Sequence, residues 1–282
     1  MATSQKLIDI DKILKENAPK SRYVPKPIIN WLKRFLHEEE LNDIVDKTKH
    51  LEGLEWAQGV LDYFNIKLQV HHEQYASLPG RFIFVPNHNL GGLDGLAIFS
   101  ILRKYHKAAR SLSNSFLLAI PNTRSLIVPV SSKTNSTKDF LTKVDDLYAS
   151  AEQVLVFPAG IVAQKINGKI QDPPWSKSFV AKAIQHKRWI VPIYMDTKNQ
   201  PKYYRFYKFR KFISKLTGTN IERFFLLRQS FTHYNNTFCI NIGKPFSYEL
   251  FDKTKDHYQW AQSVKEHVYR LGLNNDIEFT GK

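Results

Sequence analysis

The sequence predicts an α/β fold whose central sheet is mostly parallel and flanked by helices. From about residue 66, short β-type runs alternate with helical runs, which is typical of parallel strands joined by helical crossovers. The chain has 282 residues, of which 43% are hydrophobic, so it can bury a sizeable core. The first 65 residues show helical periodicity only. We therefore expect an N-terminal helical region at 1–65 and an α/β domain at 66–282.

The N-terminal region contains two helical stretches, at 26–48 and 51–66. One face of the first stretch is apolar, and its members are Ile28, Leu32, Phe35 and Leu36 with Trp31 alongside. Basic residues surround this face, namely Lys26, Lys33 and Arg34. Two interpretations stay open. The face either lies in a membrane interface, with cations at the lipid headgroups, or packs on the α/β domain.

The remaining elements follow in order along the chain. The predicted strands are 66–72, 81–87, 125–131, 154–160 and 189–196. The predicted helices are 93–107, 136–153, 176–188 and 257–273, and Ser136 or Thr137 is a suitable cap for the second. Residues 236–246 indicate a further strand and turn. Cys239 lies within that strand, so we expect it in the core.

Composition restricts the cellular setting. Lys and Arg number 41 against 26 Asp and Glu, which gives a net charge of +15 and favours a polyanionic partner. Nucleic acid, an anionic membrane surface and a phosphate-rich cofactor all fit. A single cysteine excludes an intramolecular disulfide and suits a reducing compartment. We find neither a secretory signal nor a spanning apolar run. The expected location is cytoplasmic, peripherally associated with the inner face of the cell membrane.

His88 and Asp94 flank a double glycine where a predicted strand leads into a helix. Ligands of open α/β sheets bind at the carboxyl ends of strands. A histidine there can act as general base on a hydroxyl, and a carboxylate can orient its ring. Gly91 and Gly92 allow the loop to fold back and leave N–H groups for an oxyanion. In the alternative interpretation, Asp94 only caps the helix and His88 only ends the strand.

Five motifs together carry a family resemblance. They are "NHNLGGLDG" at 87–95, "FPAG" at 157–160, "DPPW" at 172–175, "IVPIYMD" at 190–196 and "NIGKPF" at 241–246. In this order and spacing, the chain resembles the PlsC-like glycerolipid and lysophospholipid acyltransferase superfamily over residues 65–246. The similar branch contains hemolysin-like proteins and the O-acyltransferases of ornithine and glycine lipids.

The resemblance implies transfer of a fatty acyl group from an acyl-CoA or acyl-carrier protein thioester to a hydroxyl of a lysolipid. His88 and Asp94 would be catalytic. The substrate-binding residues would be Asn87, Gly91, Gly92, Phe157, Pro158, Gly160, Lys165 and Trp175. An anionic membrane surface would be a partner and nucleic acid would not. We expect no metal and no cofactor besides the thioester co-substrate.

The chain departs from the family after "FPAG". The superfamily's glutamate and arginine, which handle an acceptor phosphate, correspond to Ala159 and Val162. The branch's own glutamate, serine and arginine correspond to Ile161, Ala163 and Gln164. This argues against a phosphate acceptor and for an amino-acid lipid. Lys165 and Lys169 replace the lost cation only in part, because lysine lacks the planar fork of arginine.

Other functions stay open on the sequence alone. A catalytically decayed protein that binds lipid or membrane would explain the missing polar residues. The aromatic and basic segment 202–215 is a candidate membrane surface or, with the net charge, a nucleic-acid surface. Thioester hydrolysis would need only water in place of the acceptor. A metal at His88 and Asp94 lacks further ligands nearby.

Overall fold

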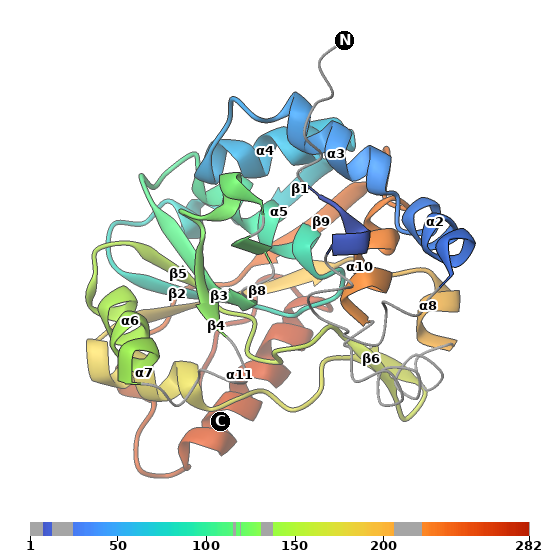
Figure 1. Ribbon diagram of the computed structural model, residues 1–282. Helices are drawn as coiled ribbons and strands as arrows, with labels where there is room; N and C mark the ends of the chain where they lie inside the picture. Colours follow the sequence, from blue (N-terminus) through green and yellow to red (C-terminus); the bar gives the residue numbers. More distant parts are fainter. Residues whose placement is uncertain are drawn as a thin grey trace.

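The computed structural model describes residues 8–12, 25–114, 117–118, 120–130, 138–205 and 222–281. Seven of the described strands form one sheet in the order β1-β9-β8-β2-β5-β3-β4 (Figure 1). Their bounds are β1 Lys67–His71, β2 Phe82–Pro86, β3 Ala109–Asn114, β4 Ile127–Val130, β5 Gln153–Leu155, β8 Trp189–Asp196 and β9 Thr237–Ile242. Strands β8, β2, β5, β3 and β4 are parallel, whereas β9 pairs antiparallel with β8 and parallel with β1. The prediction of a mostly parallel sheet flanked by helices is confirmed.

Helices cover both faces of this sheet (Figure 1). Successive side chains of β2 point to opposite faces, so Phe82 and Phe84 join one hydrophobic cluster while Ile83 and Val85 join another. The first cluster includes residues of α4 (Gly53–Tyr63) and α5 (Gly92–Leu102). The second includes residues of α6 (Lys138–Ala149), α7 (Ser178–His186) and α11 (His257–Leu271). β2 is therefore buried between two helical layers, and the loop that follows it is anchored at its start.

The expected helix at 26–48 is divided in two. α2 (Lys26–Phe35) and α3 (Glu38–Lys47) are separated at His37, whose φ of 58° is left-handed and interrupts the helix. Ile29 is buried, whereas Ile28 on the predicted apolar face is 51% exposed and therefore not buried against the α/β domain. Trp31 is 55% exposed. The division of the chain into two domains stays a prediction.

Three further features differ from the sequence prediction or lie beyond it. β3 was not predicted, although it pairs with both β4 and β5. Cys239 is only partly buried, because it faces the opposite side of β9 from the buried Phe238 and Ile240, so its place in the core was wrong. A hairpin of β6 (Gln164–Ile166) and β7 (Lys169–Gln171) follows the "FPAG" loop.

The aromatic and basic segment 202–215 falls mostly outside the described residues. Its start forms α8 (Pro201–Arg205), where Tyr203 and Tyr204 are buried against Val162. After the gap, α10 (Glu222–Ser230) returns to the side of α2, and the ring of Phe225 meets that of Phe35 edge-on at 5.6 Å. Within the described part of the chain, no helix combines the length and apolarity that crossing a membrane requires.

Candidate active site

His88 and Asp94 meet at the carboxyl end of β2. The strand ends at Pro86, a short loop carries His88, and Asp94 lies in the first turn of α5. The Nδ1 atom of His88 is 2.9 Å from Oδ2 of Asp94. The Asp94 side chain is fully buried, whereas that of His88 is 15% exposed. The carboxylate is therefore shielded from water, while the imidazole can still be reached.

The same oxygen of Asp94 also organises the loop. Oδ2 accepts hydrogen bonds from the backbone N–H groups of Asn89 and Leu90, both at 2.7 Å, and of Gly91 at 3.2 Å. Gly91 has a φ of 80°, which is strained for any residue with a Cβ. The sequence left two interpretations of Asp94 open, helix capping and orientation of the histidine. The Asp94 side chain makes the contacts of both.

The "FPAG" loop packs against the other side of His88. The centroid of the Phe157 ring is 4.2 Å from that of the imidazole. The N–H of Ala163 donates a hydrogen bond of 2.6 Å to the carbonyl of His88. Pro158 is buried, and its carbonyl accepts the N–H of Ser176 at 2.9 Å. The loop after β5 thus fixes both the ring and the backbone of the histidine.

The three glycines predicted to bind substrate differ in the availability of their backbone N–H groups. The N–H of Gly91 is used by Asp94, and that of Gly160 donates to the carbonyl of Phe157 at 3.0 Å. Gly92 is the exposed first residue of α5, where backbone N–H groups have no partner within the helix. Of the three glycines, Gly92 is the one whose position suits an oxyanion.

The remaining predicted substrate-binding residues are spread over different surroundings. Asn87 is buried, and its amide exchanges hydrogen bonds with the backbone N–H and carbonyl of Met195 at 2.7 and 3.1 Å. Trp175 has an exposed fraction of 0%, so a substrate could touch it only if the chain around it moved. Lys165 is exposed on β6, two residues beyond Ala163. Their roles in substrate binding stay predictions.

Sequence reasoning missed Asp172, which is fully buried beside the histidine. Its Oδ1 accepts the backbone N–H of His88 at 3.2 Å, and its Oδ2 accepts the indole N–H of Trp175 at 2.8 Å. Burial raises the pKa of the Asp172 carboxyl to about 6. The "DPPW" motif marked this segment, but nothing in its spacing connects it to a residue 84 positions earlier.

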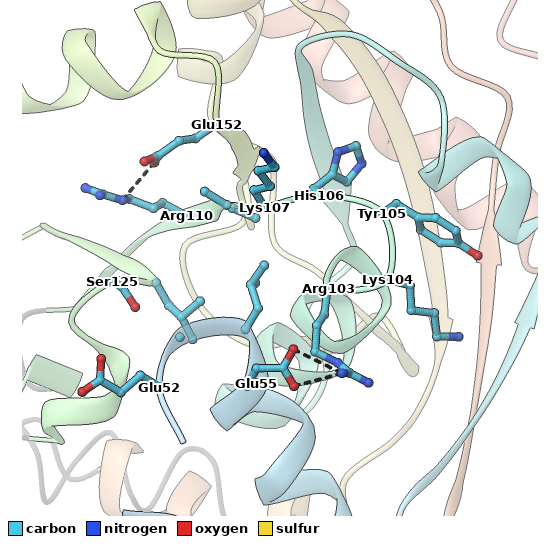
Figure 2. A pocket seen from close by; sticks show the side chains of 15 residues that line it. Glu52, Glu55, Arg103, Lys104, Tyr105, His106, Lys107, Arg110, Ser125 and Glu152 are labelled. Carbon is cyan, nitrogen blue, oxygen red and sulfur yellow. Dashed lines mark hydrogen bonds and ion pairs between the residues drawn. The ribbon is translucent and has the colours of Figure 1, made fainter. Parts of the chain in front are cut away.

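A cleft of about 620 Å³, drawn in Figure 2, lies near the amino ends of β3, β4 and β5. Its lining includes residues just before or at the start of β3 and β5, whereas His88 follows the end of the parallel strand β2. Its charges are partly matched, because Arg103 pairs with Glu55 and Arg110 pairs with Glu152, both at 2.9 Å (Figure 2). This cleft is separate from the His88 site. Among the described residues, no group of three or more His, Cys, Asp or Glu side chains could hold a metal ion.

Comparison with known proteins agrees with this geometry. A sequence model of the family described as Acyltransferase matches residues 12–276. The chain is 34% identical over 269 residues to a lyso-glycine lipid O-acyltransferase of Bacteroides thetaiotaomicron, covering 94% of this chain and 97% of that one. A protein of the same name from Phocaeicola vulgatus is also 34% identical, with coverages of 94% and 95%.

Among solved structures, the chain is similar to the 1-acyl-sn-glycerophosphate acyltransferase PlsC from Thermotoga maritima. The TM-score is 0.45 and the identity 13%, over 86% of this chain and 95% of that one. The family match spans all seven described strands of the sheet and includes His88 and Asp94. The family match and the two relatives at 34% identity therefore show that the chain belongs to the Acyltransferase family and is an acyltransferase.

Proposed function

We propose that this acyltransferase moves a fatty acyl group from an acyl thioester to a hydroxyl of a lysolipid whose headgroup is an amino acid rather than a phosphate. The observation that carries the proposal is the pair of His88 and the buried Asp94, joined at 2.9 Å. The two relatives at 34% identity, named for a lyso-glycine lipid, support the acceptor class. Coenzyme A and acyl-carrier protein are both suitable thiol carriers.

The reaction needs a single proton carrier. Nε2 of His88 removes the proton from the acceptor hydroxyl, and the oxygen attacks the thioester carbonyl. Asp94 holds Nδ1–H and stabilises the imidazolium that forms. The tetrahedral intermediate places its negative oxygen near the N-terminus of α5, where the Gly92 N–H can stabilise it. Its collapse breaks the C–S bond, and the thiolate takes the proton from Nε2 as the new ester is released.

The segment after the "FPAG" loop supports an acceptor without a phosphate. Ile161 is 51% exposed and apolar, and Val162 and Ala163 are buried. None of these side chains can pair with an anion. The exposed Lys165 supplies one point charge, not the planar fork that binds phosphate in two places. A phosphate entering here would lose water without gaining equivalent partners.

The test measures transfer of labelled palmitoyl from coenzyme A and from acyl-carrier protein to lyso-glycine lipid, with lysophosphatidate in parallel. We expect ester formation on lyso-glycine lipid, at least tenfold slower transfer to lysophosphatidate, and loss of turnover in His88→Ala. Preference for lysophosphatidate would refute the acceptor class. Turnover retained in His88→Ala would refute the catalytic role of the histidine. Vesicle binding without transfer from either donor would favour a lipid-binding protein.

We also propose that α2 contacts an anionic membrane surface next to the site. Trp31 and Ile28 are more than half exposed, and α2 also carries the exposed Lys26 and Arg34, whereas Lys33 pairs with Asp9 and Glu38. α2 is tied to α10, because Arg228 donates to the carbonyl of Phe35 at 2.7 Å. Leu226 of α10 in turn faces Gly91. Contact through α2 would therefore place the catalytic loop near the bilayer that holds the acceptor.

The membrane proposal is tested with vesicles that contain anionic lipid. Trp31→Glu should weaken vesicle binding about tenfold or more and slow transfer to lysolipid embedded in the vesicles. Transfer to the same lysolipid dispersed in detergent should be little affected. Tyr258→Glu is a matched control, because Tyr258 is 48% exposed on α11. Equal binding by Trp31→Glu and the control would exclude α2 as the contact.

A further inference from the structure

We infer that Asp172 is a positioning residue, which holds the backbone of the catalytic histidine in place. This inference rests on the proposed role of His88. The Asp172 carboxylate is fully buried and accepts two N–H groups, that of the His88 backbone at 3.2 Å and that of the Trp175 indole at 2.8 Å. It touches neither the imidazole nor Asp94 through any hydrogen bond found among the described residues. The hydrogen bond that positions His88 is therefore the one to its backbone N–H, and the charge of Asp172 also acts on the imidazole.

The loop that carries Asp172 is itself fixed to α11. The backbone N–H of Asp172 donates to the Tyr269 hydroxyl, and its carbonyl accepts Lys265 Nζ, both at 2.7 Å. The backbone of Trp175 exchanges two hydrogen bonds with the amide of Gln262, at 3.0 and 2.8 Å. The buried carboxylate is thus mounted on the C-terminal helix. The "DPPW" segment thus connects the backbone of His88 to α11, which is a structural role separate from contact with the substrate.

The site selects a carboxylate rather than a neutral amide. Two N–H donors converge on the side chain, and an ionised carboxylate offers an acceptor oxygen to each. Asparagine has one acceptor oxygen, so its NH₂ group would have to face one of the two N–H donors. Buried donors that lose their acceptor are costly, and the loop would shift to relieve the contact. The carbonyl of His88 is held by the N–H of Ala163. A shift at the His88 N–H would therefore rotate the residue about its fixed carbonyl and move the imidazole.

The consequence for catalysis is a loss of alignment rather than of chemistry. His88 is held at three places: at Nδ1 by Asp94, at its carbonyl by Ala163 and at its N–H by Asp172. A displacement of about 1 Å in a reacting group can cost about 100-fold in rate. Asp172→Asn should therefore lower kcat by about 10- to 100-fold while KM changes less than threefold.

The experiment is a double-mutant cycle with Trp175→Phe, which removes the indole N–H and keeps an aromatic ring. Turnover is measured with palmitoyl-coenzyme A or palmitoyl-acyl-carrier protein and lyso-glycine lipid. In the Trp175→Phe background, the amide of Asp172→Asn can turn its NH₂ group away from His88 and keep its oxygen on the His88 N–H. There, Asp172→Asn should lower kcat less than threefold. An equal loss in both backgrounds would overturn the inference, because independent effects add.

Two further readouts keep the test decisive. If Asp172→Asn alone does not fold, the double variant is compared with Trp175→Phe, and a tenfold loss of kcat there overturns the inference. In protein labelled with ¹⁵N-histidine, Asp172→Asn should shift the backbone signal of His88, which is assigned by its loss in His88→Ala. Asp145→Asn is the matched control and should instead shift His186, whose Nε2 lies 2.9 Å from Asp145 Oδ1. An unshifted His88 signal overturns the inference.

The kinetic and spectroscopic results separate the two claims. If His88→Ala retains turnover, the proposed function of the histidine fails, while the His88 signal still reports on its bond to Asp172. If His88→Ala is inactive and Asp172→Asn has the wild-type kcat, only the positioning role of Asp172 fails.

Discussion

Nδ1 of His88 lies 2.9 Å from Oδ2 of Asp94, and this oxygen also accepts three backbone N–H groups from the loop between the two residues. The orientation of the imidazole and the shape of the loop therefore depend on the same atom. Asp94 is fully buried, so these contacts form away from water, where hydrogen bonds to an ionised acceptor are strong. Loss of the charge should disturb catalysis and loop geometry together.

Asp94→Asn should lower kcat by about 10³- to 10⁴-fold, the cost of losing the carboxylate that orients a catalytic histidine. The amide can still accept some of the loop N–H groups, so the fold should be retained. The measurement is single-turnover transfer, with circular dichroism to check folding. Asp145→Asn removes a carboxylate of the same size between α6 and α7 and should keep nearly full activity. A loss below tenfold in Asp94→Asn would argue that Asp94 is only a helix cap.

The pair itself could be predicted from the sequence because its signal is local. Residues 88 and 94 flank a glycine-rich turn between an apolar strand and an apolar helix, and strand alternation places that turn at the carboxyl edge of the sheet. Local patterns of the same kind predicted β2 and β8 together with α5 and α7. The buried apolar residues of these elements belong to the two hydrophobic clusters, one on each face of the sheet.

The rest of the site depends on contacts between distant segments. Asp172 reaches His88 through a backbone N–H, and any residue can offer that group, so the identity of position 88 gives no sign of it. β3 was missed because its sequence, "ARSLSN", is mostly polar, and its strand structure comes from backbone pairing with β4 and β5. Arg188 is fully buried on carbonyls of Phe82 and of the segment 147–152, which sequence patterns do not reveal.

Gly91→Ala should destabilise the protein by about 1–3 kcal/mol, because a φ of 80° with a ψ of −122° is a conformation that residues with a Cβ avoid. The new methyl group would make only an ordinary contact with Leu226, at 3.5 Å, so the cost comes from the backbone conformation. Gly92→Ala is the matched control. Gly92 lies in α5 and an added Cβ meets no atom within 4 Å, so this change should leave stability equal or higher. Urea denaturation of both variants decides, and equal destabilisation would contradict the role of the Gly91 backbone.

Arg188→Met should lower the free energy of unfolding by about 3–5 kcal/mol. Arg188 is fully buried, and its guanidinium donates to the carbonyls of Phe82, Leu147, Tyr148, Ser150 and Glu152. Methionine fills similar space but removes the hydrogen bonds that the guanidinium donates to these five carbonyls. Arg81→Met is the control, because Arg81 makes two such bonds on the surface and should cost less than about 1 kcal/mol. Similar losses in thermal or urea unfolding would show that burial does not set the cost.

The pH dependence of stability should reveal the buried charge of Asp172. Burial raises its pKa from 3.8 in the unfolded chain to about 6, against the lowering effects of the Trp175 hydrogen bond and of the charges of His88 and Lys265. The folded state thus holds the proton more tightly. The resulting stabilisation is complete below about pH 4 and is lost as the pH rises through 6. The change should be on the order of 3 kcal/mol, and Asp172→Asn should not show it.

The measurement is urea denaturation of wild type, Asp172→Asn and Asp145→Asn from pH 3 to pH 7. The stability of the wild type relative to Asp172→Asn should fall over this range and level off near neutral pH. Asp145→Asn provides a control of opposite sign. Hydrogen bonds from Lys182 and His186 lower the pKa of Asp145, so that carboxylate stabilises the fold above its unfolded pKa and ceases to do so as the pH falls. The wild type relative to Asp145→Asn should therefore gain stability as the pH rises from acid values. A difference for Asp172→Asn that stays constant with pH would mean that Asp172 titrates in the fold as it does in the unfolded chain.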